Sequence, residues 1–131
     1  MPQSKVNPWK WQDPYGFSQA IEISGARRFL FCAGQTALDA EGKVTFAGDM
    51  RGQIGAAMDN VETVLAAAGL SLRHVIRLNY YTTDVDAFLA HNNVIASRLQ
   101  AAGCQPSSTL LGVKRLAFPE LLIEIEATAA E

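Results

Sequence analysis

The sequence has little excess charge and no long hydrophobic run. Its 131 residues include eleven Lys and Arg against thirteen Asp and Glu, a formal net charge of −2. Such a chain lacks the positive field that nucleic-acid binding usually needs, so we expect no nucleic-acid partner. The longest apolar stretch, residues 64–70, is far shorter than the roughly 20 residues of a membrane-spanning helix. The polar first fourteen residues also differ from a secretory signal, and we expect no membrane association.

Cysteine and histidine are scarce. Cys32 and Cys104 lie far apart in apolar surroundings, which predicts reduced, buried thiols of a cytoplasmic protein rather than a disulfide. Neither His74 nor His91 has a second His, Cys or carboxylate at metal-ligand spacing, so we expect no metal site. The glycine-rich phosphate-binding loops and the serine nucleophile elbow are absent as well. The sequence therefore gives no indication of a metalloenzyme, a nucleotide-binding enzyme or a serine hydrolase.

The length and the 49% hydrophobic content fit one folded domain. Residues 1–16 lack periodicity and contain three prolines, so we interpret them as an N-terminal arm preceding a single domain over 17–131. Trp9, Trp11 and Tyr15 on this arm are costly to leave in water. The arm is therefore expected to dock on another part of the structure.

Hydrophobic periodicity predicts the order β-β-α-β-α-β-β. Residues 18–24 and 27–33 have the pattern of two strands joined by a turn at Gly25, and we expect them to form a hairpin. Apolar residues recur every three or four positions after Asp49 and again between Asp84 and Gly103, which indicates two amphipathic helices with suitable ends. The remaining strands are expected at residues 75–82, 108–113 and 121–128.

These elements predict an α+β fold, a two-layer sandwich in which both helices cover one face of a mixed β-sheet. The other face would then carry large side chains, among them Val75, Tyr81 and Leu122. A monomer seldom exposes such a patch. We therefore expect that face to be buried against further copies of the chain.

Two acidic residues of the last strand are the best candidates for chemistry. Glu124 and Glu126 project from the same face, about 6.6 Å apart. In a pocket between subunits, desolvation would raise a carboxyl pKa and prepare a general base for water. From spacing alone we favour the alternative, a polar sheet face on which each carboxylate pairs with a cation such as Arg77 or Lys114. Asn92 is a further oddity, an amide in an apolar helical stripe that needs either a structural partner or a ligand.

Five stretches together resemble the YjgF/RidA family (reactive intermediate deaminase A, also called the L-PSP endoribonuclease family): residues 16–20 (GFSQA), 31–35 (FCAGQ), 60–69 (NVETVLAAAG), 81–84 (YTTD) and 123–127 (IEIEA). The resemblance covers almost the whole chain from residue 15 onward. It implies a chorismate-mutase-like fold and a homotrimer with a central β-barrel and clefts between subunits. It also implies hydrolysis of enamines or imines from pyridoxal-phosphate dehydratases, giving keto acids and ammonia without a cofactor.

The resemblance also assigns roles to single residues. The catalytic glutamate that activates water matches Glu124, and a small-molecule site is implied for Phe17, Gly34, Gln35, Asn92, Ser108 and Leu110. Three of these positions differ from the family pattern. Phe17 replaces a tyrosine, Leu110 replaces a frequent cysteine, and Ser108 stands where the family has the arginine that clamps the substrate carboxylate, in Pro106-Ser107-Ser108-Thr109.

The serine decides how much of the family's function we expect here. A serine hydroxyl cannot replace a bidentate, charge-assisted arginine contact, whose loss typically costs about 2–5 kcal/mol. We therefore expect weak or absent deaminase activity on amino-acid-derived imines, and a cleft suited to a neutral or larger ligand. Arg77, Lys114 and Arg115 are possible substitutes for the arginine, although surface roles are favoured for each. The alternatives are a non-catalytic trimer that binds a small molecule or stabilises a partner, and, least favoured, an endoribonuclease.

Overall fold

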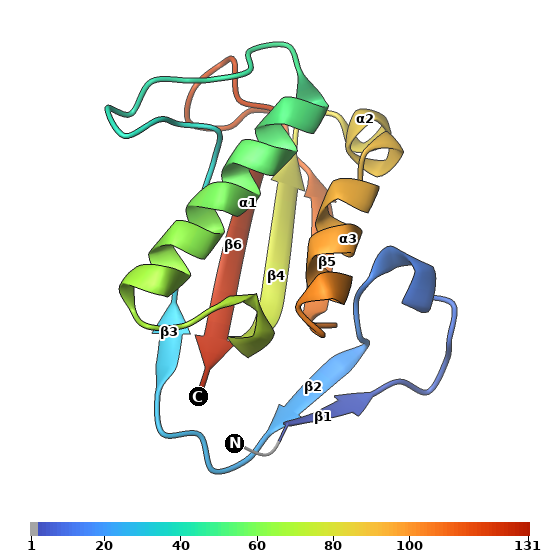
Figure 1. Cartoon of the computed structure of the whole chain (residues 1–131). Helices are drawn as coiled ribbons and strands as arrows, with labels where there is room; N and C mark the ends of the chain where they lie inside the picture. Colours follow the sequence, from blue (N-terminus) through green and yellow to red (C-terminus); the bar gives the residue numbers. More distant parts are fainter. Residues whose placement is uncertain (1–2) are drawn as a thin grey trace.

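The computed structural model describes residues 3–131 and contains a four-stranded mixed sheet with helices on one side (Figure 1). The strands lie in the order β3 (Phe29–Phe31), β6 (Ile123–Ala130), β4 (Val75–Thr82) and β5 (Ser107–Gly112). β6 is antiparallel to both neighbours, whereas β4 and β5 are parallel. The predicted α+β sandwich is thereby confirmed, with β3 and β5 as its edge strands.

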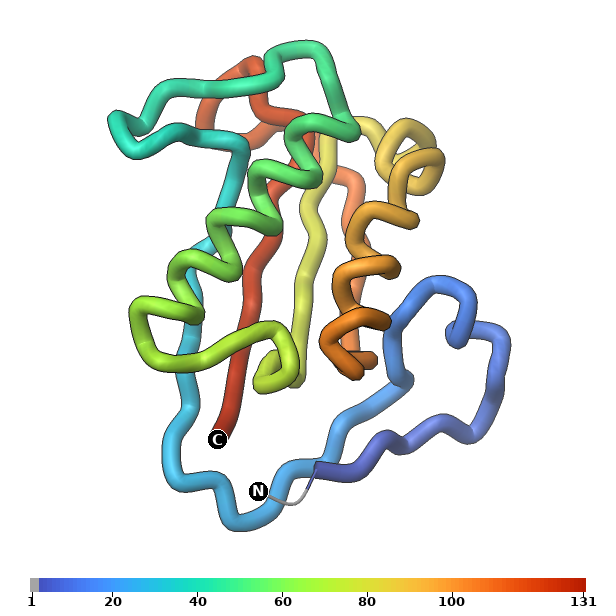
Figure 2. Tube along the Cα trace, viewed as in Figure 1, coloured from blue at the N-terminus to red at the C-terminus, as the bar shows by residue number. Residues whose placement is uncertain are grey.

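The long helix α1 (Met50–Ala67) and the shorter α3 (Asn93–Ala101) lie on the same side of the sheet, as Figures 1 and 2 show. Asp49 begins α1 as the sequence predicts, because its side chain accepts a hydrogen bond of 2.9 Å from the backbone N–H of Gly52. The predicted stripe is the buried face of α1, including Ile54, Met58 and Leu65. None of the helices between residues 3 and 131 is long and apolar enough to cross a membrane.

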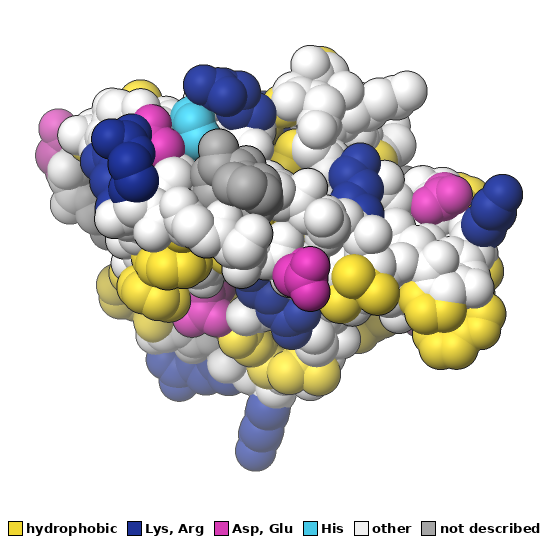
Figure 3. Space-filling model, turned by 90° about the horizontal axis from the view of Figure 1, so that it is seen from below, with side chains coloured by type: hydrophobic (Ala, Val, Ile, Leu, Met, Phe, Trp, Pro, Cys, Tyr) yellow, Lys and Arg dark blue, Asp and Glu magenta, His cyan; other side chains and the backbone are white. Residues whose placement is uncertain are grey.

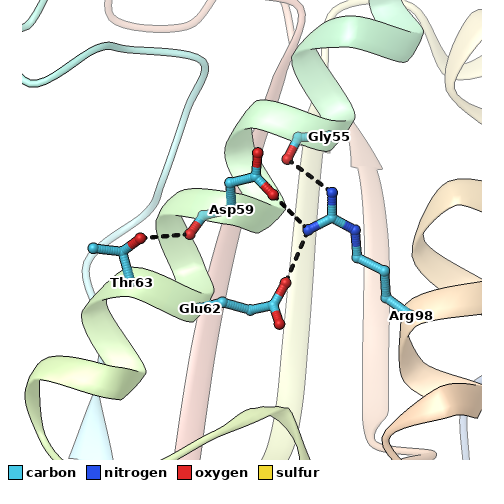
Figure 4. A network of polar contacts seen from close by, with 5 residues as sticks. All are labelled: Gly55, Asp59, Glu62, Thr63 and Arg98. Atoms are coloured by element: carbon cyan, nitrogen blue, oxygen red, sulfur yellow. Dashed lines mark hydrogen bonds and ion pairs between the residues drawn. The ribbon is translucent and has the colours of Figure 1, made fainter.

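Arg98 links the two helices through the polar network in Figure 4. It forms ion pairs of 2.7 Å with Asp59 and 2.8 Å with Glu62, both on α1. It also donates a hydrogen bond of 3.4 Å to the carbonyl of Gly55. Burial lowers the pKa of Arg98, but the hydrogen bonds to both carboxylates outweigh this effect and leave the pKa raised. The network holds α3 in register with α1.

The prediction that residues 18–24 and 27–33 form a hairpin is wrong. Strand β2 (Ala20–Ile23) pairs instead with β1 (Gln3–Val6) in a separate two-stranded antiparallel sheet. After the turn at Gly25, which has a φ of 70°, the backbone N–H groups of Arg27 and Arg28 both donate to the carbonyl of Glu131. This contact directs the chain along β6, so that β3 pairs with β6 rather than with β2.

The second predicted helix is two helices. α2 (Val85–Ala90), which Asp84 caps by accepting from the N–H of Ala87 at 3.0 Å, ends at His91. Asn92 then begins α3. Asn92 therefore lies at the break between the two helices and not within one continuous helical stripe.

The face of the sheet without helices is called the open face here. Its residues alternate with core residues on each strand: Phe29, Phe31, Arg77, Asn79, Tyr81, Thr109, Leu111, Glu124, Glu126 and Thr128. Tyr81 lies on this face as expected, but the expectation is wrong for Val75, which is fully buried in the core because a bulge between Val75 and Arg77 shifts the register. Leu122 precedes β6 and packs against the core instead. Phe31 is 78% exposed and stacks on Phe29 with ring centroids 6.4 Å apart. Apolar edges therefore flank a polar centre, as expected of a face that another copy covers.

Figure 3 shows the end of the molecule near both chain termini. Basic and acidic side chains are interspersed there with hydrophobic ones. A mixed distribution of this kind does not provide a single-sign field at this end of the molecule.

Candidate functional site

A pocket of about 370 Å³ lies beside edge strand β5, on the helix side of the sheet. We call it the aromatic pocket. Four residues that the sequence proposed as ligand-binding meet there: Phe17, Asn92, Ser108 and Leu110. Its lining is completed by residues that the prediction did not include, namely Trp11, Tyr15, Tyr80, Phe88 and Leu89.

Strand register explains how Ser108 and Leu110 reach the pocket. They are the β5 partners of Leu78 and Tyr80, two buried residues of β4 that face the helices. Side chains in register on neighbouring strands share a face. Asn92 lines the pocket from the break between α2 and α3.

The polar groups of the pocket are free to bind a ligand. Within residues 3–131, neither the Asn92 amide nor the Ser108 hydroxyl forms a side-chain hydrogen bond, unlike the neighbouring Ser107, which donates to the carbonyl of Ile76. An amide that is half-buried without a partner is costly. The structural partner considered for Asn92 is therefore not found among the described residues, and its half-buried amide is accessible to water or to a ligand.

The N-terminal arm forms one wall of the pocket, as its expected docking requires. Its aromatic side chains are nevertheless not removed from water, because Trp9, Trp11 and Tyr15 remain 58%, 60% and 53% exposed. Trp11 packs edge-to-face on Phe17, with ring centroids 5.7 Å apart. Gln12 is fully buried and donates 2.9 Å to the carbonyl of Trp9. The sequence signal that could have indicated this wall is the pair Trp11 and Tyr15, four residues apart on a proline-rich arm.

Glu124 lies with a different group of residues, on the open face. Its side chain extends over Gly34, where even a methyl group would overlap the carboxylate. Gln35 fixes this loop, since its backbone exchanges hydrogen bonds of 2.7 and 2.9 Å with Ile125. We call Gly34, Gln35 and Glu124 the acidic group.

Glu124 and Glu126 have different environments despite their common face. Burial raises the pKa of Glu124, and the charge of Glu126 raises it further. Glu126 accepts hydrogen bonds from the amide of Asn79 at 3.0 Å and from the hydroxyl of Tyr81 at 3.1 Å. The bond to Glu126 raises the pKa of Tyr81. Among the described residues, Glu126 is thus held by two side-chain donors, whereas no side chain donates a hydrogen bond to Glu124.

The alternative in which cations neutralise the pair is not what the structure shows. Ion pairs in the described part of the chain involve Arg27, Arg28 and Arg98 only. Arg77 instead donates to the hydroxyl of Thr109 at 2.7 Å on the open face. Arg115 donates to nearby backbone carbonyls.

The aromatic pocket and the acidic group lie on opposite faces of the same sheet. Ser108 faces the helices, whereas Glu124 faces away from them. Within one chain, the sheet therefore lies between Ser108 and the proposed base, Glu124. Residues 3–131 also contain no cluster of three or more His, Cys, Asp or Glu that could hold a metal ion.

A family model described as Endoribonuclease L-PSP matches residues 12–131. The chain belongs to the YjgF/RidA (L-PSP) family. A RutC family protein of Pyrococcus horikoshii is 36% identical over 113 residues, covering 86% of this chain and 85% of that protein. The YjgF/RidA resemblance seen in the sequence is thus confirmed.

Solved structures of the YjgF/RidA fold agree closely with this one. The Rid family protein YyfB from Yersinia pestis, described as of unknown function, has a TM-score of 0.86 and 35% identity, with both chains fully covered. Escherichia coli TdcF with bound serine has a TM-score of 0.71 and 26% identity, with 88% of this chain and 87% of TdcF covered.

Proposed function

We propose that this protein is a RidA-like homotrimer that hydrolyses a small imine, an enamine or a related C–N compound in clefts between subunits. The observation that carries the proposal is the separation of the two half-sites. The aromatic pocket holds unpaired groups for a ligand, and the acidic group holds the base, yet they lie on opposite sheet faces. A second copy is needed to bring them together.

The edges of the open face support this assembly. Phe29 and Phe31 stand on edge strand β3, and Leu111 stands on edge strand β5 at 50% exposure. Burying these side chains against neighbouring copies releases apolar surface from water. In the proposed assembly, three open faces surround a central barrel, and the open face of one copy meets the β5 edge of the next at the cleft between them. Glu124 of one copy then approaches the Ser108 edge of another.

The proposed chemistry needs only the chain's own residues. Ionised Glu124 takes a proton from water while the oxygen attacks the carbon of the C=N bond. Glu124 passes this proton to the nitrogen, which gives a carbinolamine. It then takes the proton of the new hydroxyl group and delivers it to the nitrogen as the C=O bond forms and the C–N bond breaks, so that a carbonyl compound and ammonia or an amine leave. The raised pKa strengthens Glu124 as a base, and the absence of a side chain at Gly34 leaves room for the carboxylate.

Ser108 limits which imines are accepted. The related TdcF holds serine, a small amino acid. The described lining of the aromatic pocket here includes no cation to bind such a carboxylate. We propose weak or absent activity on amino-acid-derived imines for this reason, with a loss of about 2–5 kcal/mol in binding. We also propose a cytoplasmic location, in which the free, buried Cys32 and Cys104 stay reduced.

The decisive experiment compares imine hydrolysis by the wild type with hydrolysis by Glu124→Gln. The matched control is Glu126→Gln, the same change two residues away on the same strand. Loss of the base should lower kcat by about 10²- to 10⁴-fold, whereas the control should keep most of the activity. Equal turnover by wild type and Glu124→Gln would remove Glu124 as the base.

A second candidate is a non-catalytic binding protein, favoured by an aromatic pocket that is complete without Glu124. Thermal shift against a metabolite library tests it, because a ligand that stabilises the protein and is recovered unchanged identifies a binding protein. The endoribonuclease alternative is supported by the family description alone. RNA cleavage that persists through rigorous purification and disappears in Glu124→Gln would establish it.

A further inference from the structure

We propose that the aromatic pocket selects an uncharged, planar aromatic compound, and that Trp11 of the N-terminal arm is the specificity-determining residue. This inference rests on the proposed function in taking the pocket as the substrate side of the cleft. It goes further by naming the substrate class and the wall that selects it.

The lining favours a neutral ring. Among the described lining residues none is charged, and seven of the nine are aromatic or leucine: Trp11, Tyr15, Phe17, Tyr80, Phe88, Leu89 and Leu110. A carboxylate placed there would lose its water without gaining a cation, which is unfavourable. Aromatic side chains instead favour offset or edge-to-face packing with another ring. The volume of about 370 Å³ is within the range of small-molecule pockets.

The two polar residues indicate what the ring carries. Asn92 offers a donor and an acceptor, and Ser108 offers a hydroxyl that serves as either. Both line the pocket among aromatic residues and leucines. A neutral amide, imine or hydroxyl substituent satisfies them without bringing a charge. Arg77, a strong cation on the neighbouring strand, is on the opposite face and is bonded to Thr109.

The segment that follows Trp11 is anchored before any ligand binds. The side-chain amide of Gln105 donates 3.0 Å to Asp13 and 2.9 Å to the carbonyl of Phe17. Ser18 returns two hydrogen bonds, from its hydroxyl to the carbonyl of Gln105 and from its N–H to that of Pro106.

These bonds connect the arm directly to the segment that leads into Ser108. The wall and the polar edge of the pocket therefore form one unit. A pocket ordered in advance loses less entropy when a rigid ring enters it.

The test uses benzamide and benzoate, two probes of nearly the same shape that differ in charge. Binding to the full-length protein is measured by calorimetry at millimolar concentrations. The wild type should bind benzamide at least about tenfold more tightly than benzoate. Ser108→Arg should reverse this preference, because it supplies the missing cation.

The contribution of the wall is tested with a matched pair of tryptophan variants. Trp11→Ala should weaken benzamide binding by about tenfold. Trp9→Ala should not, since Trp9 is not among the described lining residues, although the two tryptophans are similarly exposed, 58% for Trp9 and 60% for Trp11. Equal effects of the two substitutions would overturn the role of Trp11.

Equal affinity for both probes, or no saturable binding of either, would overturn the proposed selectivity. The outcome is independent of the hydrolytic proposal. A wild type that prefers benzamide while Glu124→Gln keeps full turnover overturns the catalytic role alone. Turnover that needs Glu124 without any aromatic preference overturns the selectivity alone.

Discussion

At the scale of single residues, the consequential feature is the unequal environment of two glutamates on one strand. Asn79 and Tyr81 hydrogen-bond to Glu126, so its charge is supported by donors. Within residues 3–131 no side chain gives Glu124 a hydrogen bond or an ion pair, and its pKa is raised by burial and by Glu126. Spacing alone presented the two carboxylates as equivalent, because alternation along a strand reports a shared face and not the neighbours across it.

The raised pKa of Glu124 makes a stability prediction with a defined sign. A carboxyl group whose folded-state pKa is raised costs stability once it ionises, so its favourable contribution is lost as pH rises through that pKa. Glu124→Gln should therefore be more stable than the wild type at pH 7. The difference should shrink on acidification and vanish below the ordinary glutamate value of 4.5. Urea unfolding of both proteins across this pH range measures it, and a difference that grows toward acid pH would contradict it.

Gly34 is predicted to be needed for the position of Glu124 more than for the fold. A methyl group there would overlap the carboxylate, which is the mobile end of a side chain and can rotate away. Gly34→Ala should therefore cost only about 1 kcal/mol of stability, while imine hydrolysis falls by at least about tenfold. Combining it with Glu124→Ala supplies the control, because the steric effect should then disappear. The same stability loss in both backgrounds would show that Gly34 acts through another contact.

At the scale of elements, α1 and the start of β6 are joined by a buried side chain. Gln53 has no exposed surface. It donates 2.9 Å to the carbonyl of Glu120 and 3.2 Å to that of Phe46, and it accepts 2.8 Å from the N–H of Leu122. These bonds align the strand that carries Glu124. The helical stripe did not single out Gln53, because its partners belong to loops distant in sequence.

Gln53→Leu keeps the volume of the side chain and removes all three hydrogen bonds. Leaving the backbone partners unsatisfied should lower the free energy of unfolding by about 1–3 kcal/mol. Gln100→Leu is the matched control, since Gln100 is exposed on α3 and should change stability by less than about 0.5 kcal/mol. Chemical denaturation measures both variants. Equal effects would show that the buried bonds of Gln53 add nothing.

At the scale of the whole molecule, the fold leaves one sheet face uncovered with aromatic residues at its edge. Phe29 and Phe31 are 52% and 78% exposed and stack on each other. The proposed oligomerisation through this face would account for both their exposure and the division of the proposed site between two sheet faces.

Phe31→Glu is predicted to dissociate the assembly, because it places a charge where apolar surface is buried. Light scattering after gel filtration should show the mass falling from that of a trimer to that of one chain, with imine hydrolysis lost at the same time. Phe118→Glu, a change at another exposed phenylalanine outside the sheet, should leave the mass unchanged. A wild-type protein that is itself monomeric would contradict the assembly outright.

The sequence by itself determined the two-layer fold, the long helix α1 and the faces of most residues of β4 and β6, because periodicity is a local property of the backbone. Only the tertiary structure placed Val75 in the core, through a bulge between Val75 and Arg77. Only the tertiary structure decided that β2 pairs with β1, that the second helix breaks at Asn92, and that Trp11 forms a pocket wall. It also decided that Ser108 and Glu124 face opposite sides of one sheet. These outcomes depend on strand pairing and on loop contacts such as that of Arg28 with Glu131, which join residues far apart in the chain and leave no periodic signal along it.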